Sequence, residues 1–160
     1  MKTNAARILE GLGIAYTLQE YEVDPEDLSA INVARKIGLP VEQVFKTLLT
    51  LTGPNEYAFA VIPGDAELDF KKLARAAGAR KAEMVSLKDV QPLTGYIRGG
   101  VTVFGAKKDF PVFADETIEL FDFVSVSAGQ RGVQVFLAPQ DYLSASHATV
   151  AGLTKDQARS

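Results

Sequence analysis

Two apolar segments separated by a short turn constrain the fold of this chain more than any other feature. The segment VFKTLLTLTG at 44–53 is followed by a GPNE turn and then by YAFAVI at 57–62. The second segment is a short continuous apolar run, which is typical of a strand covered on both faces. Other layers of structure must therefore pack on both sides of this strand.

Short amphipathic helices with clear end signals are expected to supply those layers. Residues 3–12 carry apolar side chains at helical spacing. Ser29 is placed to cap a second helix that ends at Gly38, and Asp69 is placed to cap a third helix that ends at Gly78. Three helices are thus predicted before the middle of the chain is passed.

In the rest of the chain, the expected helices and strands do not alternate regularly. SLKD at 86–89 has the spacing of a capping box and predicts a short helix. DYLSAS at 141–146 predicts a closing helix, after which the tail is expected to fray. The further expected strands are IAYTLQEYEV, KAEMV, FPVF, ELFDFVSV and VQVFL, the last two joined by an AGQRG turn. This mixture predicts a single α/β (mixed α+β) domain over residues 1–160, with a mixed sheet and helices packed around it.

Composition and charge narrow the class of protein. No apolar run approaches the length needed to span a bilayer, and the N-terminal MKTNAARILEG lacks a signal-peptide core, so a cytoplasmic protein is expected. The net charge of −3 argues against a protein that grips a long run of nucleic acid. Any such contact must be short, locally basic or helped by a partner. KKLARAAGARK at 71–81 could be the basic patch, although such a cluster is usually a solvated helix face.

The chain lacks the residues of the common catalytic sites. It has no cysteine, and its one histidine, His147, lies near the C-terminal end, where a surface position is expected. No zinc-binding spacing, P-loop or dinucleotide-binding motif is present, so no metal or cofactor is expected. An enzyme built from this chain would lack a standard nucleophile of its own.

Lys46 is the first candidate site residue, because it lies within an apolar strand. It shares one side of the strand with Val44 and Leu48. One interpretation is that its stem packs on the sheet while its ammonium group reaches water. The other is that it lines a pocket and binds a phosphate or a carbonyl oxygen as a point charge.

Two glycine-containing segments are the other candidates. TGYIRGGVTVFGAKK at 94–108 contains Gly99 and Gly100, whose backbone could approach a ligand closely and present N–H groups to it. The alternative is a plain loop between a helix and a strand. The AGQRG turn lies next to Ser127, which could donate a hydrogen bond into a cleft, or the segment could be only a hairpin turn.

Six further segments occur in a fixed order along the chain: TNAARILE, VFKTLL, VIPGDAELDFKKLARAAGARKAEM, TGYIRGG, GAKKDFPVF and VSAGQRG. In this order they resemble the YbaK family of Cys-tRNA(Pro) deacylases, which is related to the editing insertion domain of bacterial prolyl-tRNA synthetases. Each motif alone has low specificity, but six in register over roughly residues 1–140 are specific, and they resemble the stand-alone type.

The resemblance implies a trans-editing deacylase that acts on the aminoacylated 3′ end of tRNA. Prolyl-tRNA synthetase mischarges tRNA(Pro) with cysteine because the two amino acids are close in size, and binding alone rejects a near-isostere poorly. In the family, the sulfur of the substrate cysteine attacks its own ester carbonyl and releases a cyclic thiolactone. Cys-tRNA(Pro) is the implied substrate, with Cys-tRNA(Cys) as a further candidate. A transient complex with prolyl-tRNA synthetase is implied, and no cofactor or metal.

The resemblance also assigns roles to eight residues. Lys46 would hold the 3′-terminal nucleotide through its phosphate or ribose. The backbone N–H groups of Gly99 and Gly100 would position or polarise the ester carbonyl. The other pocket positions are Tyr21, Thr47, Tyr96, Ser127 and Gln134.

This chain departs from the family pattern in ways that bear on selectivity. Gln134 stands where some relatives carry Asp, and Gln130 replaces a Lys in the preceding turn. The spacing before Lys46 is about one residue shorter than in some relatives, so no role is assigned within 24–32. Two alternatives to a cysteine-specific deacylase therefore remain: a deacylase for another small amino acid such as alanine, and a non-catalytic module that binds a tRNA end or a nucleotide.

The fold that the resemblance implies is more specific than the fold that the residues predict alone. It is a strongly curved, mixed sheet of six or seven strands that approaches a barrel, with the helices outside.

Overall fold

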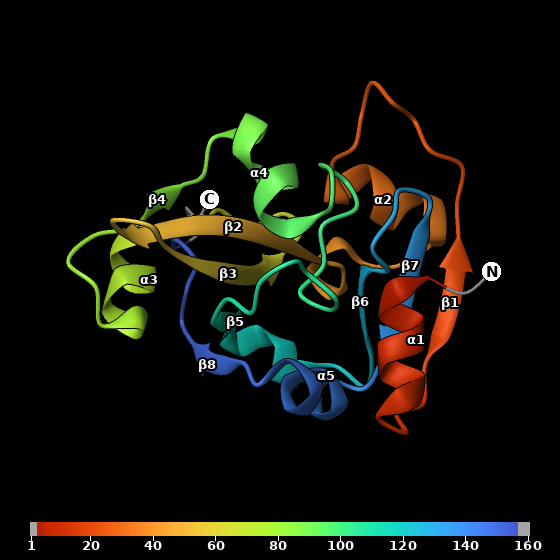
Figure 1. The fold of residues 1–160 in the computed structure, drawn as a ribbon. Coiled ribbons are helices and arrows are strands. Elements are labelled where there is room, and N and C mark those ends of the chain that lie inside the picture. The colour runs from red at the N-terminus through yellow and green to blue at the C-terminus, as the bar shows by residue number, and fades with distance from the viewer. Residues whose placement is uncertain (1–2, 157–160) are drawn as a thin grey trace.

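The computed structural model describes residues 3–156, which form two β-sheets with short helices around them (Figure 1). The larger sheet has the strand order β4-β2-β3-β5-β8, and the smaller sheet has the order β1-β7-β6. The bounds of the strands are β1 Thr17–Glu20, β2 Phe45–Gly53, β3 Glu56–Pro63, β4 Glu83–Met84, β5 Val112–Asp115, β6 Val124–Ser127, β7 Val133–Leu137 and β8 Thr149–Ala151.

The predicted helix ends are confirmed by their capping contacts. Ser29 Oγ accepts a hydrogen bond from the backbone N–H of Asn32, and Asp69 Oδ1 accepts from the N–H groups of Lys71 and Lys72. Gly38 ends its helix in the left-handed conformation, with a φ of 75°, which glycine adopts without steric cost. The helices are α1 Asn4–Gly11, α2 Ala30–Ile37, α3 Phe70–Ala77, α4 Leu87–Thr94 and α5 Pro139–Ser146, with 3₁₀ turns at Val41–Gln43 and Glu116–Leu120.

Strand β3 is covered on both faces, as its continuous apolar run predicts. Phe59 and Val61 point into a cluster that includes residues of α1, α5 and both sheets. Ala60 and Ile62 point to the opposite side, into a second cluster with Leu73 of α3. β3 pairs antiparallel with β2 and parallel with β5, and β5 pairs parallel with β8, so the larger sheet is mixed.

The mixed α/β fold is confirmed, but the strongly curved single sheet is not found. The described strands form two sheets that are connected by one isolated parallel bridge between Val44 and Ser125. Beyond this bridge, the described strands of the two sheets do not pair with one another, and β2 pairs with β3 from Phe45 onward. The division into two sheets matters for function, because the start of β2 lies where the two sheets meet.

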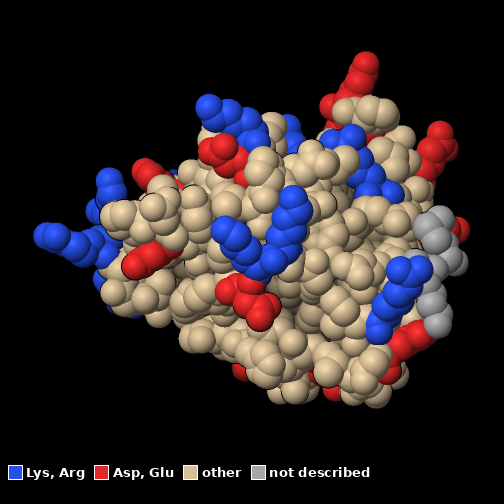
Figure 2. Space-filling model, viewed as in Figure 1, with Lys and Arg blue, Asp and Glu red and all other residues tan. Residues whose placement is uncertain are grey.

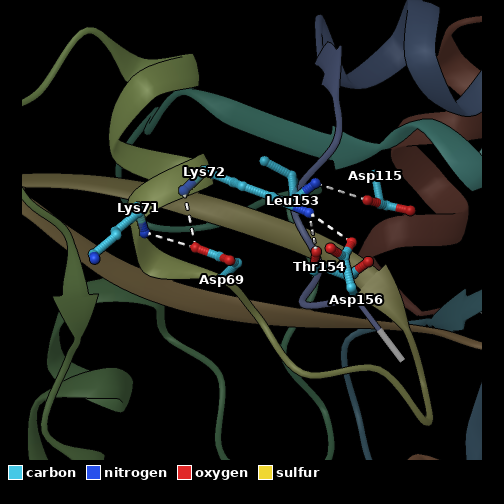
Figure 3. Close-up of polar contacts among 7 residues, drawn as sticks. All are labelled: Asp69, Lys71, Lys72, Asp115, Leu153, Thr154 and Asp156. Carbon is cyan, nitrogen blue, oxygen red and sulfur yellow. Dashed lines mark hydrogen bonds and ion pairs between the residues drawn. The ribbon is translucent and has the colours of Figure 1, made fainter. Parts of the chain in front are cut away.

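The expectation that the tail frays after α5 is wrong for the described residues. β8 pairs with β5, and Leu153, which is fully buried, donates its N–H to Asp115 Oδ1 at 2.9 Å. Lys72 Nζ donates to the carbonyl oxygen of Thr154 at 2.7 Å, so the tail is fastened to the N-terminal turn of α3 (Figure 3). The buried carboxylate of Asp115 and the lysine at the start of α3 hold in place the backbone that follows β8.

Two local predictions also need correction. Of ELFDFVSV, only the part from Val124 onward forms a strand: the first two residues end the 3₁₀ turn that Asp115 starts by accepting from the N–H of Thr117, and residues 121–123 form a bend. The helix after SLKD forms as α4, but Ser86 makes no side-chain capping bond; its carbonyl oxygen accepts from the N–H of Asp89 at 2.9 Å.

Candidate active site

A cavity of about 640 Å³ lies where the start of β2 meets α2, the turn after β3, the segment 84–90, the turn at 98–101 and the smaller sheet. Its volume falls within the range of small-molecule sites. Five of the eight predicted site residues line it. These are Lys46, Thr47, Gly99, Ser127 and Gln134.

Lys46 lies in β2 and reaches into this cavity with a partly buried side chain. Its Nζ donates a hydrogen bond to the carbonyl oxygen of Gly64 at 3.2 Å. Burial lowers the pKa of Lys46 below the ordinary lysine value, and the carboxylates of Asp65 and Glu67 oppose part of this shift. A carbonyl oxygen uses one of three ammonium donors, so the group can bind an anionic or carbonyl oxygen of a ligand with the others.

Gly64 shapes the wall behind this ammonium group. A Cβ atom at Gly64 would lie 2.7 Å from the Cβ atom of Ala30 and 2.9 Å from the carbonyl oxygen of Val44. Any larger residue would separate α2 from the start of β2 and move the carbonyl that holds Lys46. Sequence reasoning missed Gly64, although the β2–β3 hairpin register carries the signal: Lys46 pairs with Ile62, two residues before it.

The two glycines of the Gly-Gly pair have different surroundings. Ile97 to Gly100 form a turn in which the Gly100 N–H donates to Ile97 O at 2.9 Å, and Gly99 has a φ of 88°. Gly99 lines the cavity, whereas Gly100 is buried outside its lining. A Cβ atom on Gly100 would lie 3.0 Å from Gln130 Cα, so this glycine allows the loop to pack on the AGQRG turn. The expectation that both N–H groups face a ligand therefore needs correction at Gly100.

Arg131 controls how the peptide unit between Arg98 and Gly99 is turned. Arg131 Nε donates to the carbonyl oxygen of Arg98 at 2.8 Å. The C=O and N–H of a trans peptide unit point in opposite directions. The Gly99 N–H is therefore directed away from Arg131. Sequence reasoning assigned no role to Arg131, because the contact joins two turns that are far apart in the chain.

Ser127 and Gln134 come from neighbouring strands of the smaller sheet and form a cross-strand pair. Ser127 Oγ accepts from the N–H of Gly129 at 3.2 Å, which orders the turn between β6 and β7. Gln134 is buried, and its Oε1 accepts from Ser125 Oγ at 2.8 Å. This bond fixes the orientation of the Gln134 amide.

Tyr96 and Tyr21 do not line the cavity, unlike the other predicted pocket residues. Tyr96 Oη donates to the carbonyl oxygen of Phe104 at 2.5 Å and accepts from Asn4 Nδ2 at 3.3 Å, so it fastens α1 to the loop behind the site. Tyr21 packs beside α2, and its N–H donates to the carbonyl oxygen of Gly132. Both positions support the walls of the site instead of contacting its interior.

Large apolar side chains surround the mouth of the cavity. Ile31, Met84 and Leu87 line it and are 58%, 46% and 61% exposed. They come from α2, β4 and the start of α4, three segments that sequence analysis did not bring together. Exposed apolar residues grouped at the mouth of a charged cavity are typical of a binding site.

The predicted basic cluster lies apart from the cavity. Lys and Arg side chains gather at the end of the molecule that carries α3, and others lie over α4 (Figure 2). One member of the cluster, Lys72, is engaged by the tail, as Figure 3 shows. None of the five basic residues at 71–81 lines the cavity. His147 is exposed at the C-terminal end of α5.

Within residues 3–156, no helix combines the length and the apolar character needed to cross a membrane. The same described residues contain no group of three or more potential metal ligands of the His, Cys, Asp and Glu types. The polar groups that line the cavity are the ammonium group of Lys46, the guanidinium group of Arg98, the carboxylates of Asp65 and Glu67, the hydroxyls of Ser29, Thr47 and Ser127, the amide of Gln134 and the backbone of Gly99.

Comparison with known proteins gives concordant matches. The aminoacyl-tRNA editing domain family matches residues 24–145. The chain is 43% identical over 153 residues to the "Putative Cys-tRNA(Pro)/Cys-tRNA(Cys) deacylase EbsC" of Enterococcus faecalis, covering 96% of this chain and 93% of that protein. It is 30% identical over 92 residues to the "Multifunctional Ser/Thr-tRNA deacylase ProXp-y" of Escherichia coli, covering 57% of this chain and 55% of that protein.

A solved structure has the same fold. The crystal structure of "a putative trans-editing enzyme for prolyl tRNA synthetase" superposes with a TM-score of 0.83, at 24% sequence identity, over 98% of this chain and 99% of that one. At this level of identity, the likeness establishes the arrangement of the elements alone.

Proposed function

Because the chain belongs to the aminoacyl-tRNA editing domain family, we propose that it is a trans-editing deacylase that cleaves cysteine from mischarged tRNA(Pro). The observation that carries this proposal is the cavity in which the Lys46 ammonium group and the Gly99 backbone occur together. The similarity to EbsC extends the candidate substrates to Cys-tRNA(Cys). Incubation of the purified protein with Cys-tRNA(Pro) tests the proposal: release of the amino acid above the buffer control is expected, and its absence contradicts the proposal.

The proposed reaction uses the nucleophile of the substrate. The cysteine sulfur attacks the ester carbonyl carbon, a C–S bond forms, and the bond from that carbon to the 3′ oxygen of the ribose breaks. The thiol proton passes to the departing 3′ oxygen, and water later opens the cyclic thiolactone to cysteine. The protein has to hold thiol and carbonyl in attack geometry, and such positioning supplies much of the acceleration in intramolecular reactions.

Each predicted site residue that lines the cavity would have a part in that task. Lys46 would bind the phosphate or ribose of the terminal nucleotide through the donors that Gly64 does not use. The Gly99 N–H would polarise the ester carbonyl as negative charge develops on its oxygen. Thr47, Ser127 and Gln134 would contact the aminoacyl group. Tyr21, Tyr96 and Gly100 would act indirectly, through the walls of the site.

Replacement of Arg131 tests the role of the Gly99 N–H. Arg131→Met keeps the length of the side chain but removes the donor to Arg98 O, so the peptide unit before Gly99 is free to turn. We expect kcat for Cys-tRNA(Pro) to fall about 10-fold with little change in KM, because an oxyanion donor acts mainly in the transition state. Arg75→Met, which removes the same charge from the exposed surface of α3, is the matched control. Equal rates for the two variants would show that Arg131 does not act through Gly99.

A deacylase for another small amino acid is the second candidate. One observation favours it: part of the chain is similar to a Ser/Thr-tRNA deacylase. The family resemblance adds that Gln134 would provide an amide where some relatives provide a carboxylate. A neutral amide cannot bind a substrate ammonium group as strongly as a carboxylate can. Under this alternative, serine, threonine or alanine esters would be cleaved without help from sulfur.

We also propose that prolyl-tRNA synthetase supplies tRNA recognition in a transient complex. The basis is the net charge of −3, which predicts weak intrinsic affinity for the tRNA body. The isolated chain should deacylate Cys-tRNA(Pro) and Cys-tRNA(Cys) at similar rates, and addition of the synthetase should accelerate only the former. Strong selection between the two tRNAs by the isolated chain would contradict this proposal.

A further inference from the structure

Arg98 is a charged residue of the cavity to which the proposed reaction gives no task. It lines the cavity and is exposed, so its side chain lies at the mouth. Its backbone carbonyl is bound by Arg131, but within residues 3–156 its guanidinium group makes no hydrogen bond or ion pair. The ammonium group of Lys46, by contrast, already has a backbone partner. The N–H donors of the Arg98 guanidinium group are therefore available to a ligand.

The backbone of Arg98 is held on both sides, unlike that of an ordinary exposed loop residue. Arg131 Nε donates to Arg98 O at 2.8 Å, and the N–H of Gly100 donates to Ile97 O at 2.9 Å, which closes a turn from Ile97 to Gly100, the arginine turn. A Cβ atom placed on Gly99 would lie 3.4 Å from Arg131 Cγ, so the turn also packs against that side chain. A ligand has to order only the side-chain torsions of Arg98, and preorganisation of this kind lowers the cost of binding.

Three exposed apolar side chains at the same mouth, Ile31, Met84 and Leu87, form an apolar rim. Leu28, which lies just before α2, adjoins the arginine turn, because a Cβ atom placed on Gly99 would be 3.5 Å from Leu28 Cδ2. The part of the rim that α2 supplies is thereby next to that turn. A nucleotide has a base with flat faces that bind apolar and aromatic groups, and a phosphate that binds cations. The mouth therefore offers a complementary contact to each part of a nucleotide.

The negative charges of the cavity come from a different segment of its wall. Asp65 and Glu67 belong to the turn after β3, and Glu67 is paired with Lys155 at 3.4 Å. In the described part of the chain, neither carboxylate makes an ion pair with Arg98. Carboxylates repel a phosphate, so a phosphate that enters the mouth is favoured beside the arginine turn.

We propose that the mouth of the cavity is a subsite for the nucleotide that precedes the terminal adenosine of the tRNA: Arg98 binds the 5′ phosphate of that nucleotide, and the apolar rim contacts its base. This inference rests on the proposed deacylase function. With the acylated nucleoside in the interior beside Lys46, the unpaired chain that continues from it leaves through the mouth. A guanidinium group binds a phosphate through two parallel N–H···O bonds, which also orients the chain.

Shortened substrates separate these two contacts from the rest of the site. The cysteine esters of adenosine, of the dinucleotide CA and of the trinucleotide CCA differ by one nucleotide at each step. The penultimate base is first present in CA, and the phosphate on its 5′ side is first present in CCA. Release of cysteine above the buffer rate gives kcat/KM for each ester, and for the wild-type protein we expect it to rise at both steps.

Arg98→Met keeps the apolar stem and removes the guanidinium group. We expect kcat/KM for the CCA ester to fall about 10-fold through KM, with the CA and adenosine esters unaffected. The plot of log kcat/KM against log salt concentration should become shallower by about 0.7 for the CCA ester alone. Arg80→Met, which removes an exposed arginine outside the cavity, is the matched control. No loss on the CCA ester, or an equal loss on all three esters, would overturn the phosphate contact.

Leu87→Gln keeps the size of a rim side chain and makes it polar. We expect kcat/KM to fall about 3- to 5-fold for the CA and CCA esters and to stay unchanged for the adenosine ester, because only the first two carry the penultimate base. Leu120→Gln is the matched control, since Leu120 is 76% exposed and does not line the cavity. An equal loss on the adenosine ester would overturn the base contact.

The wild-type protein separates this inference from the function on which it rests. Equal kcat/KM for the adenosine and CCA esters would overturn the subsite and leave the deacylase function standing. A wild-type protein that releases no cysteine from Cys-tRNA(Pro) would overturn the deacylase function and this inference together.

Discussion

Replacement of Lys46 by alanine is expected to lower kcat/KM for Cys-tRNA(Pro) about 10²- to 10³-fold, because a charge-assisted contact to the bound terminal nucleotide or ester is lost in a partly desolvated site. The fold should survive. Lys46 makes one hydrogen bond, to the Gly64 carbonyl, and burial disfavours its charged form. Single-turnover release of labelled cysteine, measured beside the melting temperature, checks both expectations.

Lys46→Met is the matched variant for this experiment, because it keeps the apolar stem and removes the ammonium group. It should be as inactive as the alanine variant and should unfold at the same or a higher temperature, since burial of a charge is avoided. Lys72→Met, which removes a lysine outside the cavity, should deacylate normally but unfold at a lower temperature, because it releases the tail from α3. Normal turnover by either Lys46 variant would remove this residue from the mechanism.

The second large effect concerns the acyl group. On one tRNA(Pro), the cysteine ester should be cleaved at least about 10³-fold faster than the serine and alanine esters, because alanine has no nucleophile and a neutral hydroxyl is a much weaker one than a thiol. Initial rates with the three esters, at equal protein concentration, measure this ratio. Comparable rates would instead support the deacylase for other small amino acids. Specific binding of all three esters without cleavage would support the non-catalytic module.

Much of the fold can be predicted from short stretches of sequence, and the structure confirms these predictions. The caps at Ser29 and Asp69 and the apolar run of β3 depend on a few neighbouring residues, so their sequence is sufficient to predict them. The strand β8 is different. It pairs with β5, and Asp115 and Lys72, which lie far from it in the chain, bind the backbone that follows it; no pattern within 149–151 encodes those contacts.

The site shows the same division between local and long-range information. The sequence shows that Lys46 lies inside an apolar strand. Whether its ammonium group reaches water or lines a cavity depends on the position of Gly64, whose carbonyl oxygen it contacts. The register of the β2–β3 hairpin indicates that Gly64 lies near Lys46. That register is difficult to derive from the sequence, because an irregularity between Leu51 and Gly53 shifts the pairing by one residue. The role of Arg131 requires a contact between distant segments, and the chemical character of this residue alone does not reveal it.

Tyr96 illustrates the limit of transferring a role by resemblance. A tyrosine near a glycine pair suggests a pocket residue, yet its hydroxyl is bound by Phe104 and Asn4 behind the site. The strongly curved sheet has the same origin, since it was implied by the family resemblance and not by any pattern in the strands. Where side chains point depends on packing that a motif does not specify.

A panel of natural esters changes the shape of the acyl group together with its nucleophile. The most direct test of the account changes the nucleophile alone, by comparing Cys-tRNA(Pro) with 2-aminobutyryl-tRNA(Pro), in which a methyl group replaces the thiol, under single-turnover conditions. If the bound substrate is cleaved by its own sulfur, the protein should cleave the cysteine ester. The aminobutyryl ester should decay no faster with the protein than in buffer alone. Loss of both esters at similar rates would mean that the attacking group is a water molecule or a group of the protein, and this would contradict self-cleavage through sulfur.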